Sequence, residues 1–353
     1  KRAVALKVMD KTLVEIEKDD VENEVRIMAQ LQTWGLDSPQ GSRHILRWES
    51  VDCALNHYIA TEYVANGSLS AFLHSAYDKA YKNIKEQTKD NINPNDLGKT
   101  VGYWFMHQVA LPLFGSILQG LVYLHTQNVC HLDIDPYNIA VGGTAPNFEA
   151  KFIDFGSSQL LDHRMRVGAG PVTPAIKAKV TYRSPELKEN ARKRSEYLNY
   201  LRKHRHSTNL AEDQAKVPKG FDGRLSDIYS TGVVGFEMMM YAFRFDACNG
   251  SSFVSNANAK WHSSVMDHNE NKCTHLTCLF CMHNIKIPDF AWSILVQMID
   301  LDENKRGTAF DLVQTWQNGL KNFNEEFPGP HKIPHGCNLV AYEHLSAAFA
   351  RAA

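Results

Sequence analysis

The chain has 353 residues, of which 44% are hydrophobic, and its formal net charge is −1. A chain of this length forms one large domain or two ordinary ones and can bury a substantial core. The near-neutral charge provides no general attraction to nucleic acid or to an anionic membrane, and we find no apolar run of the ~18 residues that a membrane-spanning helix needs. Seven cysteines without a regular framework indicate a reducing compartment. We therefore expect a soluble cytoplasmic protein and leave the nucleus open.

The first 65 residues are dominated by strand patterns. Residues 3–9, 45–51 and 57–60 are rich in β-branched and other apolar residues and predict three strands. Between the first two, a helix is predicted from about Asp19, because apolar residues recur at helical spacing and acidic residues suit a helix N-terminus. The stretch from Thr61 to Gly67 then predicts a turn.

The remainder of the chain is predicted to be mostly helical. Apolar spacing and turn residues predict helices at 68–74, 103–125, 225–241 and 290–299, short strands at 138–141 and 150–153, and a polar inserted loop at 84–100. A β-rich front followed by an α-rich back predicts an α+β fold with two lobes.

Charged residues occur in the order that phosphoryl transfer needs. This chemistry uses a cation on the phosphates of ATP, carboxylate and amide ligands for Mg²⁺, and a base that orients the incoming hydroxyl. Lys7 ends the strand pattern Val4-Ala5-Leu6-Lys7, and Glu24 follows in a predicted helix. Because a buried lysine needs a partner, the two side chains are predicted to pair.

The strongest signal is the run from His131 to Asn138. Asp133 lies near its start, and Asp154-Phe155-Gly156 follows further along, between a strand pattern and a polar loop. Either motif alone is common by chance, but their order and spacing after a Val-Ala-x-Lys strand are not. The run resembles the catalytic loop of eukaryotic-type protein kinases, and Asp154-Phe155-Gly156 resembles their magnesium motif.

Further motifs extend this resemblance to about residue 318. Tyr182–Glu186 resembles the Ala-Pro-Glu motif with serine in place of alanine, and Asp227–Val233 resembles the helix that anchors the catalytic loop. Arg306 matches the arginine that pairs with Glu186, a structural role. Pro136 inside the catalytic loop is typical of serine/threonine kinases.

The resemblance implies a protein serine/threonine kinase that transfers the γ-phosphoryl of Mg-ATP to a protein hydroxyl. Asp133 would be the base, Lys7 would grip the phosphates, and Asn138 and Asp154 would hold Mg²⁺. The contacts implied for nucleotide and metal together are Lys7, Glu24, Thr61, Glu62, Val64, Asn138 and Asp154.

The resemblance also implies a domain layout. A small β-rich N-lobe would occupy residues 1–65, a large α-helical C-lobe residues 66–322 with insertions near 75–100 and 187–220, and a tail residues 323–353. The Gly-rich phosphate loop, which should precede Lys7, is missing from a chain that starts without methionine. We favour a truncated N-lobe over a genuine loss.

Three departures from the family pattern surround Asp133. Leu132 replaces the arginine that receives a phosphorylated activation loop, so activation through a site such as Thr173 is disfavoured. Asp135 replaces the lysine that contacts the γ-phosphate. Lys179 replaces the threonine that normally faces this lysine, and we therefore expect Lys179 to reach Asp133 and Asp135 and to return a cation to the site.

Two other functions compete with an active kinase. A pseudokinase scaffold is favoured by the missing Gly-rich loop, Leu132 and Asp135, but a fold alone would not need the acidic and amide residues that remain. A small-molecule phosphotransferase is disfavoured by the Asp154-Phe155-Gly156 and Pro185-Glu186 motifs. The sequence predicts neither the oligomeric state nor the physiological substrate.

Two segments outside the catalytic motifs carry unusual residues. Cys273, His275, Cys278, Cys281 and His283 have partial metal-ligand spacing, but the apolar residues between them favour a buried helix over a zinc site. The long stretch from Glu186 to Asp227 is basic, and we favour a solvated helix over a docking surface for acidic partners.

Overall fold

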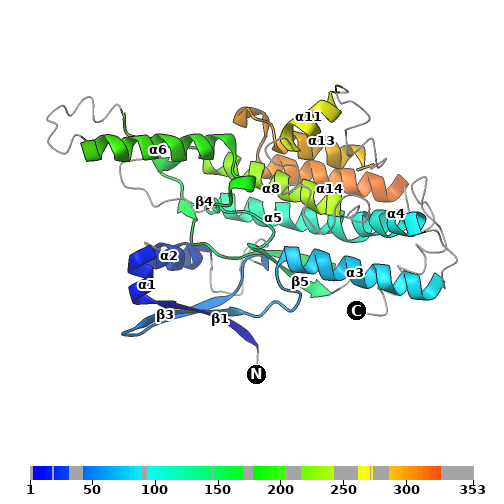
Figure 1. The fold of residues 1–353 in the computed structure, drawn as a ribbon, viewed down its shortest axis with the longest axis horizontal. Coiled ribbons are helices and arrows are strands. Elements are labelled where there is room, and N and C mark those ends of the chain that lie inside the picture. The colour runs from blue at the N-terminus through cyan, green and yellow to red at the C-terminus, as the bar shows by residue number, and fades with distance from the viewer. Residues whose placement is uncertain are drawn as a thin grey trace.

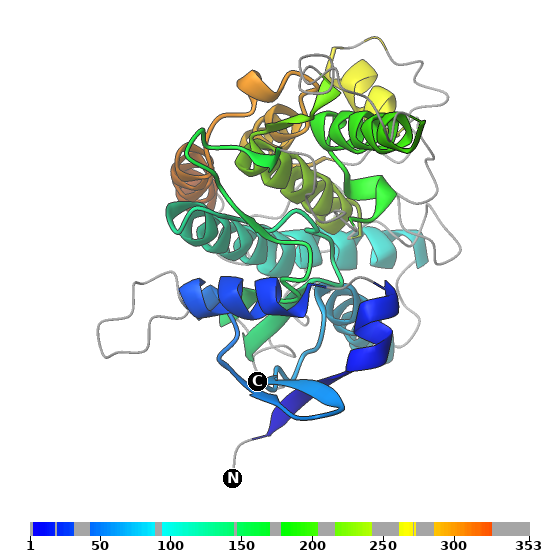
Figure 2. The ribbon, with the colours of Figure 1, turned by 90° about the vertical axis from the view of Figure 1, so that its left-hand side faces the viewer.

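The computed structural model describes residues 3–17, 20–31, 43–88, 94–144, 147–169, 178–203, 216–241, 261–270, 272 and 286–326. The β-rich N-terminal residues lie at one end of the molecule and most helices at the other (Figures 1 and 2). The predicted α+β fold with two lobes is confirmed.

The N-terminal lobe is built on a three-stranded antiparallel sheet in the order β1-β3-β2. Its strands are β1 (Val4–Asp10), β2 (Trp48–Asp52) and β3 (Asn56–Glu62). In this register Lys7 is the partner of Ile59, and Ala5 is the partner of Thr61. The sheet therefore brings Lys7 close to the strand that leads into the C-terminal lobe.

Two helices accompany the sheet, and an aspartate directly precedes each of them. Helix α2 (Val21–Leu31) was predicted, and the Asp20 carboxylate accepts the Asn23 N–H at 2.9 Å, as an N-cap does. Helix α1 (Lys11–Glu17) was not predicted; there the Asp10 carboxylate accepts the N–H groups of Thr12 and Leu13. Helix α2 buries its apolar face and Glu24 together.

The C-terminal lobe is mainly helical. Its helices are α3 (Leu69–Thr88), α4 (Pro94–Phe105), the π-helical turn η2 (Met106–Ala110), α5 (Leu111–Thr126), η3 (Val180–Tyr182), α6 (Pro185–Lys203), α8 (Gly223–Tyr241), α11 (Trp261–Asn269), α13 (Asp289–Met298), η5 (Glu303–Lys305) and α14 (Ala309–Glu326). Its strands are β4 (Val129–Cys130), β5 (Ile139–Thr144), β6 (Asn147–Phe152), β7 (Gln159–Leu160), β8 (Val167–Ala169) and β9 (Lys219–Phe221).

The prediction of a loop at 84–100 is wrong. Helix α3 continues to Thr88, and α4 already begins at Pro94. Ala76, Tyr77, Ala80 and Ile84 recur at helical spacing and are buried. The polar residues with Asn, Pro and Gly at 84–100 suggested a loop, whereas Ile84 at the start of this stretch and Leu97 near its end are buried on helices α3 and α4.

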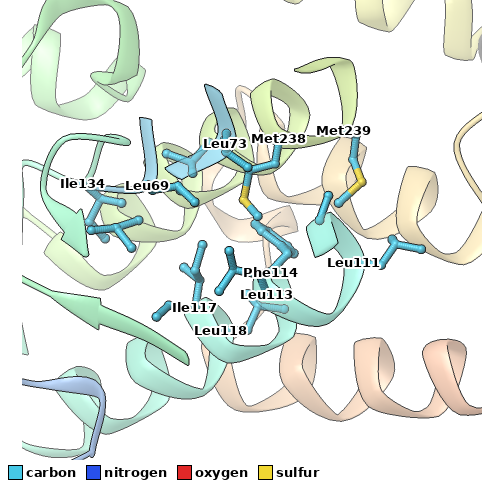
Figure 3. Close-up of a cluster of buried hydrophobic side chains, with 14 of the residues drawn as sticks. Leu69, Leu73, Leu111, Leu113, Phe114, Ile117, Leu118, Ile134, Met238 and Met239 are labelled. Carbon is cyan, nitrogen blue, oxygen red and sulfur yellow. The ribbon is translucent and has the colours of Figure 1, made fainter. Parts of the chain in front are cut away.

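Helix α5 lies at the centre of the C-terminal lobe. Leu113, Phe114, Ile117 and Leu118 are completely or almost completely buried, and Figure 3 shows them packed against side chains of α3 and α8. Pro112 stands at the start of α5, directly after η2. Because proline lacks an N–H and its ring clashes with the preceding turn, we attribute the wider π-helical turn to this residue.

The expectation that no run is long and apolar enough to cross a membrane is wrong for one segment. The continuous helical run Leu97–Thr126 meets that requirement by length and composition, but most of its apolar window is buried inside the protein. A central core helix meets the same test, and α5 occupies that place in the fold.

Several predicted features lie outside the described residues. They are Thr173, the Cys273–His283 cluster and the tail from residue 327 onward. Of the basic stretch after Glu186, the structure describes helix α6 and strand β9. Among the described residues, no group of three or more His, Cys, Asp or Glu side chains could hold a metal ion.

Candidate active site

The loop from His131 to Asn138 is held in place by Asp227 of helix α8. The Asp227 carboxylate accepts the N–H groups of His131 and Leu132, both at 2.8 Å, and lies 3.2 Å from His125 Nε2. Its side chain is completely buried. Leu132 has a φ of 63°, which a non-glycine residue rarely adopts, and two charge-assisted hydrogen bonds hold this region of the backbone.

Asp133 and Asn138 face each other across this loop. Asn138 Nδ2 donates to the Asp133 carboxylate and to the Asp133 carbonyl, both at 2.9 Å. The Lys179 backbone N–H donates to the other Asp133 carboxylate oxygen at 3.2 Å. Burial, which outweighs the favourable field of His131, raises the pKa of Asp133 to about 6. Asp133 is thus oriented by two donors and is more basic than an ordinary aspartate.

The predicted pair between Lys7 and Glu24 is present. Lys7 Nζ lies 2.9 Å from both Glu24 carboxylate oxygens, and Glu24 is almost completely buried. Lys7 Nζ also lies 3.4 Å from Asp154 Oδ1. Burial alone would lower the pKa of Lys7, but the two carboxylates outweigh it and the pKa is raised. Lys7 is therefore a cation held between the Glu24 carboxylate of the N-terminal lobe and the Asp154 carboxylate of the C-terminal lobe.

The motif around Asp154 is anchored by its phenylalanine. Phe155 is buried and packs against the His131 ring, with ring centroids 5.2 Å apart. Asp154 has a φ of 62°, so its backbone is left-handed. Burial would raise the pKa of Asp154, but Lys7, His131 and the Gly156 N–H together lower it. The Asp154 carboxylate is held in the anionic form that a metal ligand needs.

Asp135 and Lys179 form an ion pair next to Asp133. Lys179 Nζ lies 2.5 Å from Asp135 Oδ2, and it stands over the Tyr137 ring at 4.2 Å from the centroid. The other Asp135 oxygen accepts the N–H groups of Tyr137 and Asn138. Asp135 is completely buried, whereas about half of the Lys179 side chain is exposed. The structure thus brings Lys179 to Asp135 through its ammonium and to Asp133 through its backbone.

A cavity of about 410 Å³ connects the two lobes. Of the residues predicted for the site, Lys7, Glu24, Thr61, Glu62, Val64 and Asp154 line it. The carboxylate of Glu62 pairs with Lys151 Nζ at 3.0 Å, so only part of this residue is available to a ligand. Asp133, Asn138 and Lys179 do not line the cavity. They lie next to it, because the Asn138 carbonyl accepts the N–H of Ile153, which is a lining residue.

The apolar lining of the cavity was missed from the sequence. Met28, Leu46, Ile59, Ala140 and Phe152 contribute to it. They come from α2, β3, β5, β6 and the segment before β2, and no local motif marks them. The register of β3 could have identified Ile59, because it is paired with Lys7 across the sheet. A larger cavity of about 660 Å³ lies between α6 and β9 and contains none of the predicted site residues.

The donor set fits a nucleotide with Mg²⁺. The Asn138 amide nitrogen donates both to the carbonyl and to the carboxylate of Asp133, which leaves the Asn138 amide oxygen for a cation. One amide oxygen and the ionised Asp154 carboxylate are the type of ligands that Mg²⁺ takes when phosphates and waters complete its shell. The apolar cavity with one fixed cation, Lys7, matches a flat base joined to phosphates.

Glu186 and Arg306 have the structural role that was predicted for them. The two guanidinium nitrogens of Arg306 lie 2.6 and 3.0 Å from the two Glu186 oxygens. Arg306 also donates to the carbonyls of Asp300 and Leu225 and is completely buried. This bidentate pair links the start of α6 to the segment before α14.

Comparison with known proteins gives one family. Residues 1–199, more than half of the chain, match the family described as protein kinase domain. The chain is 28% identical over 171 residues to serine/threonine-protein kinase chk-2 of Caenorhabditis elegans, covering 48% of this chain and 28% of that protein. It is 24% identical over 185 residues to calcium/calmodulin-dependent protein kinase type 1 of Macrobrachium nipponense, covering 51% and 44%.

A longer alignment reaches into the C-terminal part. The chain is 24% identical over 246 residues to myosin light chain kinase 3 of Danio rerio, covering 69% of this chain and 25% of that protein. In each of these comparisons the chain spans less than half the length of the relative.

Proposed function

The chain belongs to the protein kinase domain family, and from this premise we propose that it is an active serine/threonine kinase that transfers the γ-phosphoryl of Mg-ATP to a protein hydroxyl. The observation that carries the proposal is the position of Lys7, whose ammonium lies between Glu24 and Asp154 at the cavity that joins the lobes. A fold without catalysis would not need a buried glutamate in this place.

The remaining residues have complementary roles in this proposal. Asn138 and Asp154 would hold the metal of Mg-ATP, which would supply the phosphoryl group. Asp133 orients the substrate hydroxyl and accepts its proton, for which a raised pKa makes it a better base. Asn138 and the Lys179 N–H fix the direction of the Asp133 carboxylate.

The alternative is a pseudokinase that binds partners without transfer. It is supported by Asp135, an anion at a place where the family has a cation that contacts the γ-phosphate. The Lys179–Asp135 pair weakens this argument, because it neutralises the carboxylate next to Asp133.

Phosphate transfer from labelled ATP to a mixed protein substrate tests the proposal. We expect Asp133→Asn to lose at least about 100-fold in rate, because a positioned base contributes that much or more. Glu270→Gln, an exposed charge change outside the cavity, serves as the control. The label should be found on serine or threonine. Equal transfer by the parent protein and Asp133→Asn would remove the assignment, and nucleotide binding without transfer would favour the pseudokinase.

A further inference from the structure

A second cavity, of about 660 Å³, lies between helix α6 and strand β9. Cavities of this volume hold small organic ligands in many proteins. One wall is a single face of α6, because Asn190, Lys193, Tyr197 and Tyr200 recur at helical spacing. Residues 216–221 form another wall. None of the described lining residues belongs to the predicted active site, so a ligand bound here would be independent of the proposed kinase activity.

The cavity has a defined shape because α6 packs directly against strand β8. Asn190 of α6 donates to the Gly168 carbonyl at 3.4 Å. Gly168 has a φ of 66°, and a Cβ atom there would lie 3.0 Å from Asn190 Oδ1. Glycine therefore suits this close contact best. Strand β8 in turn pairs with β9, with Ala169 opposite Lys219. Hydrogen bonds thus connect α6 through β8 to β9, and so join two walls of the cavity.

Most of the negative charge in the lining is already neutralised. Arg192 lies 2.6 Å from Glu189 and 2.5 Å from Glu196. Lys193 pairs with Glu189 as well, at 3.3 Å. Glu186 is held by the buried arginine of its bidentate pair. These three carboxylates therefore have cationic partners within the protein and leave little negative charge for a ligand.

Arg166 and Glu303 both line the cavity but do not pair with each other. Arg166 Nε and Glu303 Oε2 are buried, and neither atom has a hydrogen-bond partner among the described residues. Burial and the charge of Glu186 raise the pKa of Glu303, which makes this carboxyl easier to protonate. The Arg166 guanidinium thus lacks an ion-pair partner within the described part of the chain, and its planar donors suit an added anion.

The remaining charges and the apolar surface indicate the chemistry of a ligand. Lys216 stands over the Tyr200 ring at 3.6 Å from its centroid, and Lys219 is exposed and has no ion-pair partner among the described residues. Together with Arg166, these lysines exceed the one carboxyl that is left, Glu303, so the cavity carries an excess of positive charge. The apolar part of the lining consists of Val217, Pro218, Phe221 and the rings of Tyr197 and Tyr200.

We propose that this cavity binds a phosphate monoester that carries an aromatic group, with Arg166 as the main contact of the phosphate. A phosphate near neutral pH carries a charge of about −1.5 to −2 and three acceptor oxygens, so it matches several cations better than a carboxylate does. The aromatic group would lie on the apolar part of the lining. A phosphotyrosine side chain and a free nucleoside monophosphate share this chemistry.

Calorimetric titration of the full chain with three probes tests the inference. Phenyl phosphate represents a phosphotyrosine side chain, AMP represents a free nucleotide, and inorganic phosphate lacks the aromatic group. We expect at least one of the two esters to bind at least about fivefold more tightly than inorganic phosphate, because its ring buries apolar surface. Its affinity should fall as the salt concentration rises. The ester that binds more tightly identifies the source of the ligand, and equal affinity for all three probes overturns the inference.

Two substitutions in the lining should change the affinity for this ester in opposite directions. Arg166→Gln removes the main contact of the phosphate and should raise Kd by at least about tenfold. Glu303→Gln removes a negative charge that acts on Arg166 and should lower Kd by about two- to fivefold. A disturbed cavity would weaken binding in both variants, so the two signs together identify an anion contact.

Two control variants separate this cavity from the rest of the molecule. Arg202→Gln removes an exposed cation near the end of α6, outside the lining, and Lys7→Met alters the cavity between the lobes. Both should bind the ester as the parent protein does, and the ester should slow hydrogen exchange in Lys219–Phe221. Loss of binding in Lys7→Met with unchanged binding in Arg166→Gln would place the ester in the other cavity and overturn the inference. Failure of both esters to bind overturns it as well.

Discussion

At the scale of single residues, the Lys179–Asp135 pair makes the sharpest prediction. The Asp135 carboxylate is completely buried, and Lys179 is its ion-pair partner. Lys179→Met would leave this anion without a cation beside the proposed base. We expect kcat/KM to fall by at least about tenfold and the free energy of unfolding to fall by about 1–3 kcal/mol. Steady-state kinetics and denaturant unfolding measure the two effects.

The double variant separates the two roles of Lys179. In Asp135→Asn/Lys179→Met the buried group is neutral, so at least half of the lost stability should return. Activity should stay low if the ammonium itself acts near the transferred phosphoryl. Unchanged kcat/KM in Lys179→Met, or full recovery of activity in the double variant, would contradict a catalytic role for Lys179.

The sequence predicted this pair because both of its residues differ from the family pattern at positions that normally face each other. A lysine expected at position 135 and a threonine expected at 179 are both replaced, and the replacements are complementary in charge. Such complementarity predicts a contact without any coordinates. The direction of the Asp133 carboxylate was not predictable, because it depends on a backbone N–H and on the amide orientation of Asn138.

At the scale of elements, an apolar cluster holds the described residues between β7 and α6, 161–169 and 178–184. It consists of Cys130, Leu132, Val167, Ala178, Leu187 and Phe221. Strand β8 from this segment pairs with β9, with Val167 opposite Phe221. Leu132 occupies the place of the arginine that would receive a phosphorylated loop. Apolar packing and strand pairing therefore stabilise the segment here, and no phosphate is needed for these contacts.

Replacing Leu132 tests this account of the segment. Leu132→Ala removes a buried side chain and should cost about 2–4 kcal/mol in unfolding free energy. Hydrogen exchange in Val167–Ala169 should accelerate more than exchange in the core helix α5, because the cluster opens locally. Leu73→Ala, in the main core, is the control that lowers stability without this local effect. Equal acceleration in both regions would mean that Leu132 stabilises only the global fold.

Element predictions succeeded where one local signal dominates. Helix α2 was predicted because its apolar spacing is clear, and strand β1 because β-branched and apolar residues surround Lys7. Helix α1 was missed because seven residues form too short a window for helical periodicity, and its start depends on the Asp10 cap. The loop predicted at 84–100 failed because polar residues on one helix face were read as a loop.

At the scale of the whole molecule, the site combines residues far apart in the chain. Lys7 and Asp154 are 147 positions apart, yet their charged atoms lie 3.4 Å from each other. Motif order predicted that these residues cooperate. Packing of α5 against α3 and α8 follows from side-chain volumes and was not predictable from motifs.

His107 makes a prediction about the pH dependence of the whole fold. It lies in η2, and its ring packs against Phe323 of α14 with centroids 5.0 Å apart. Burial lowers the pKa of His107 to about 4. In the unfolded chain the pKa is about 6.5. Between pH 6.5 and pH 4 the unfolded chain binds a proton at His107 and the folded protein does not. The stability that the neutral imidazole contributes to the fold is therefore fully present above pH 6.5, and the free energy of unfolding decreases as the pH falls toward 4.

Unfolding free energies at pH 7.5 and pH 5 test this linkage. The parent protein should lose about 1–2 kcal/mol more between these values than His107→Gln, because glutamine has no proton to bind. His163→Gln, which removes an exposed histidine, should behave like the parent protein. The same loss in all three proteins would show that His107 is readily protonated in the folded state. A smaller loss only in His107→Gln would show that one partly buried imidazole at the α14 contact contributes to acid sensitivity of the entire C-terminal lobe.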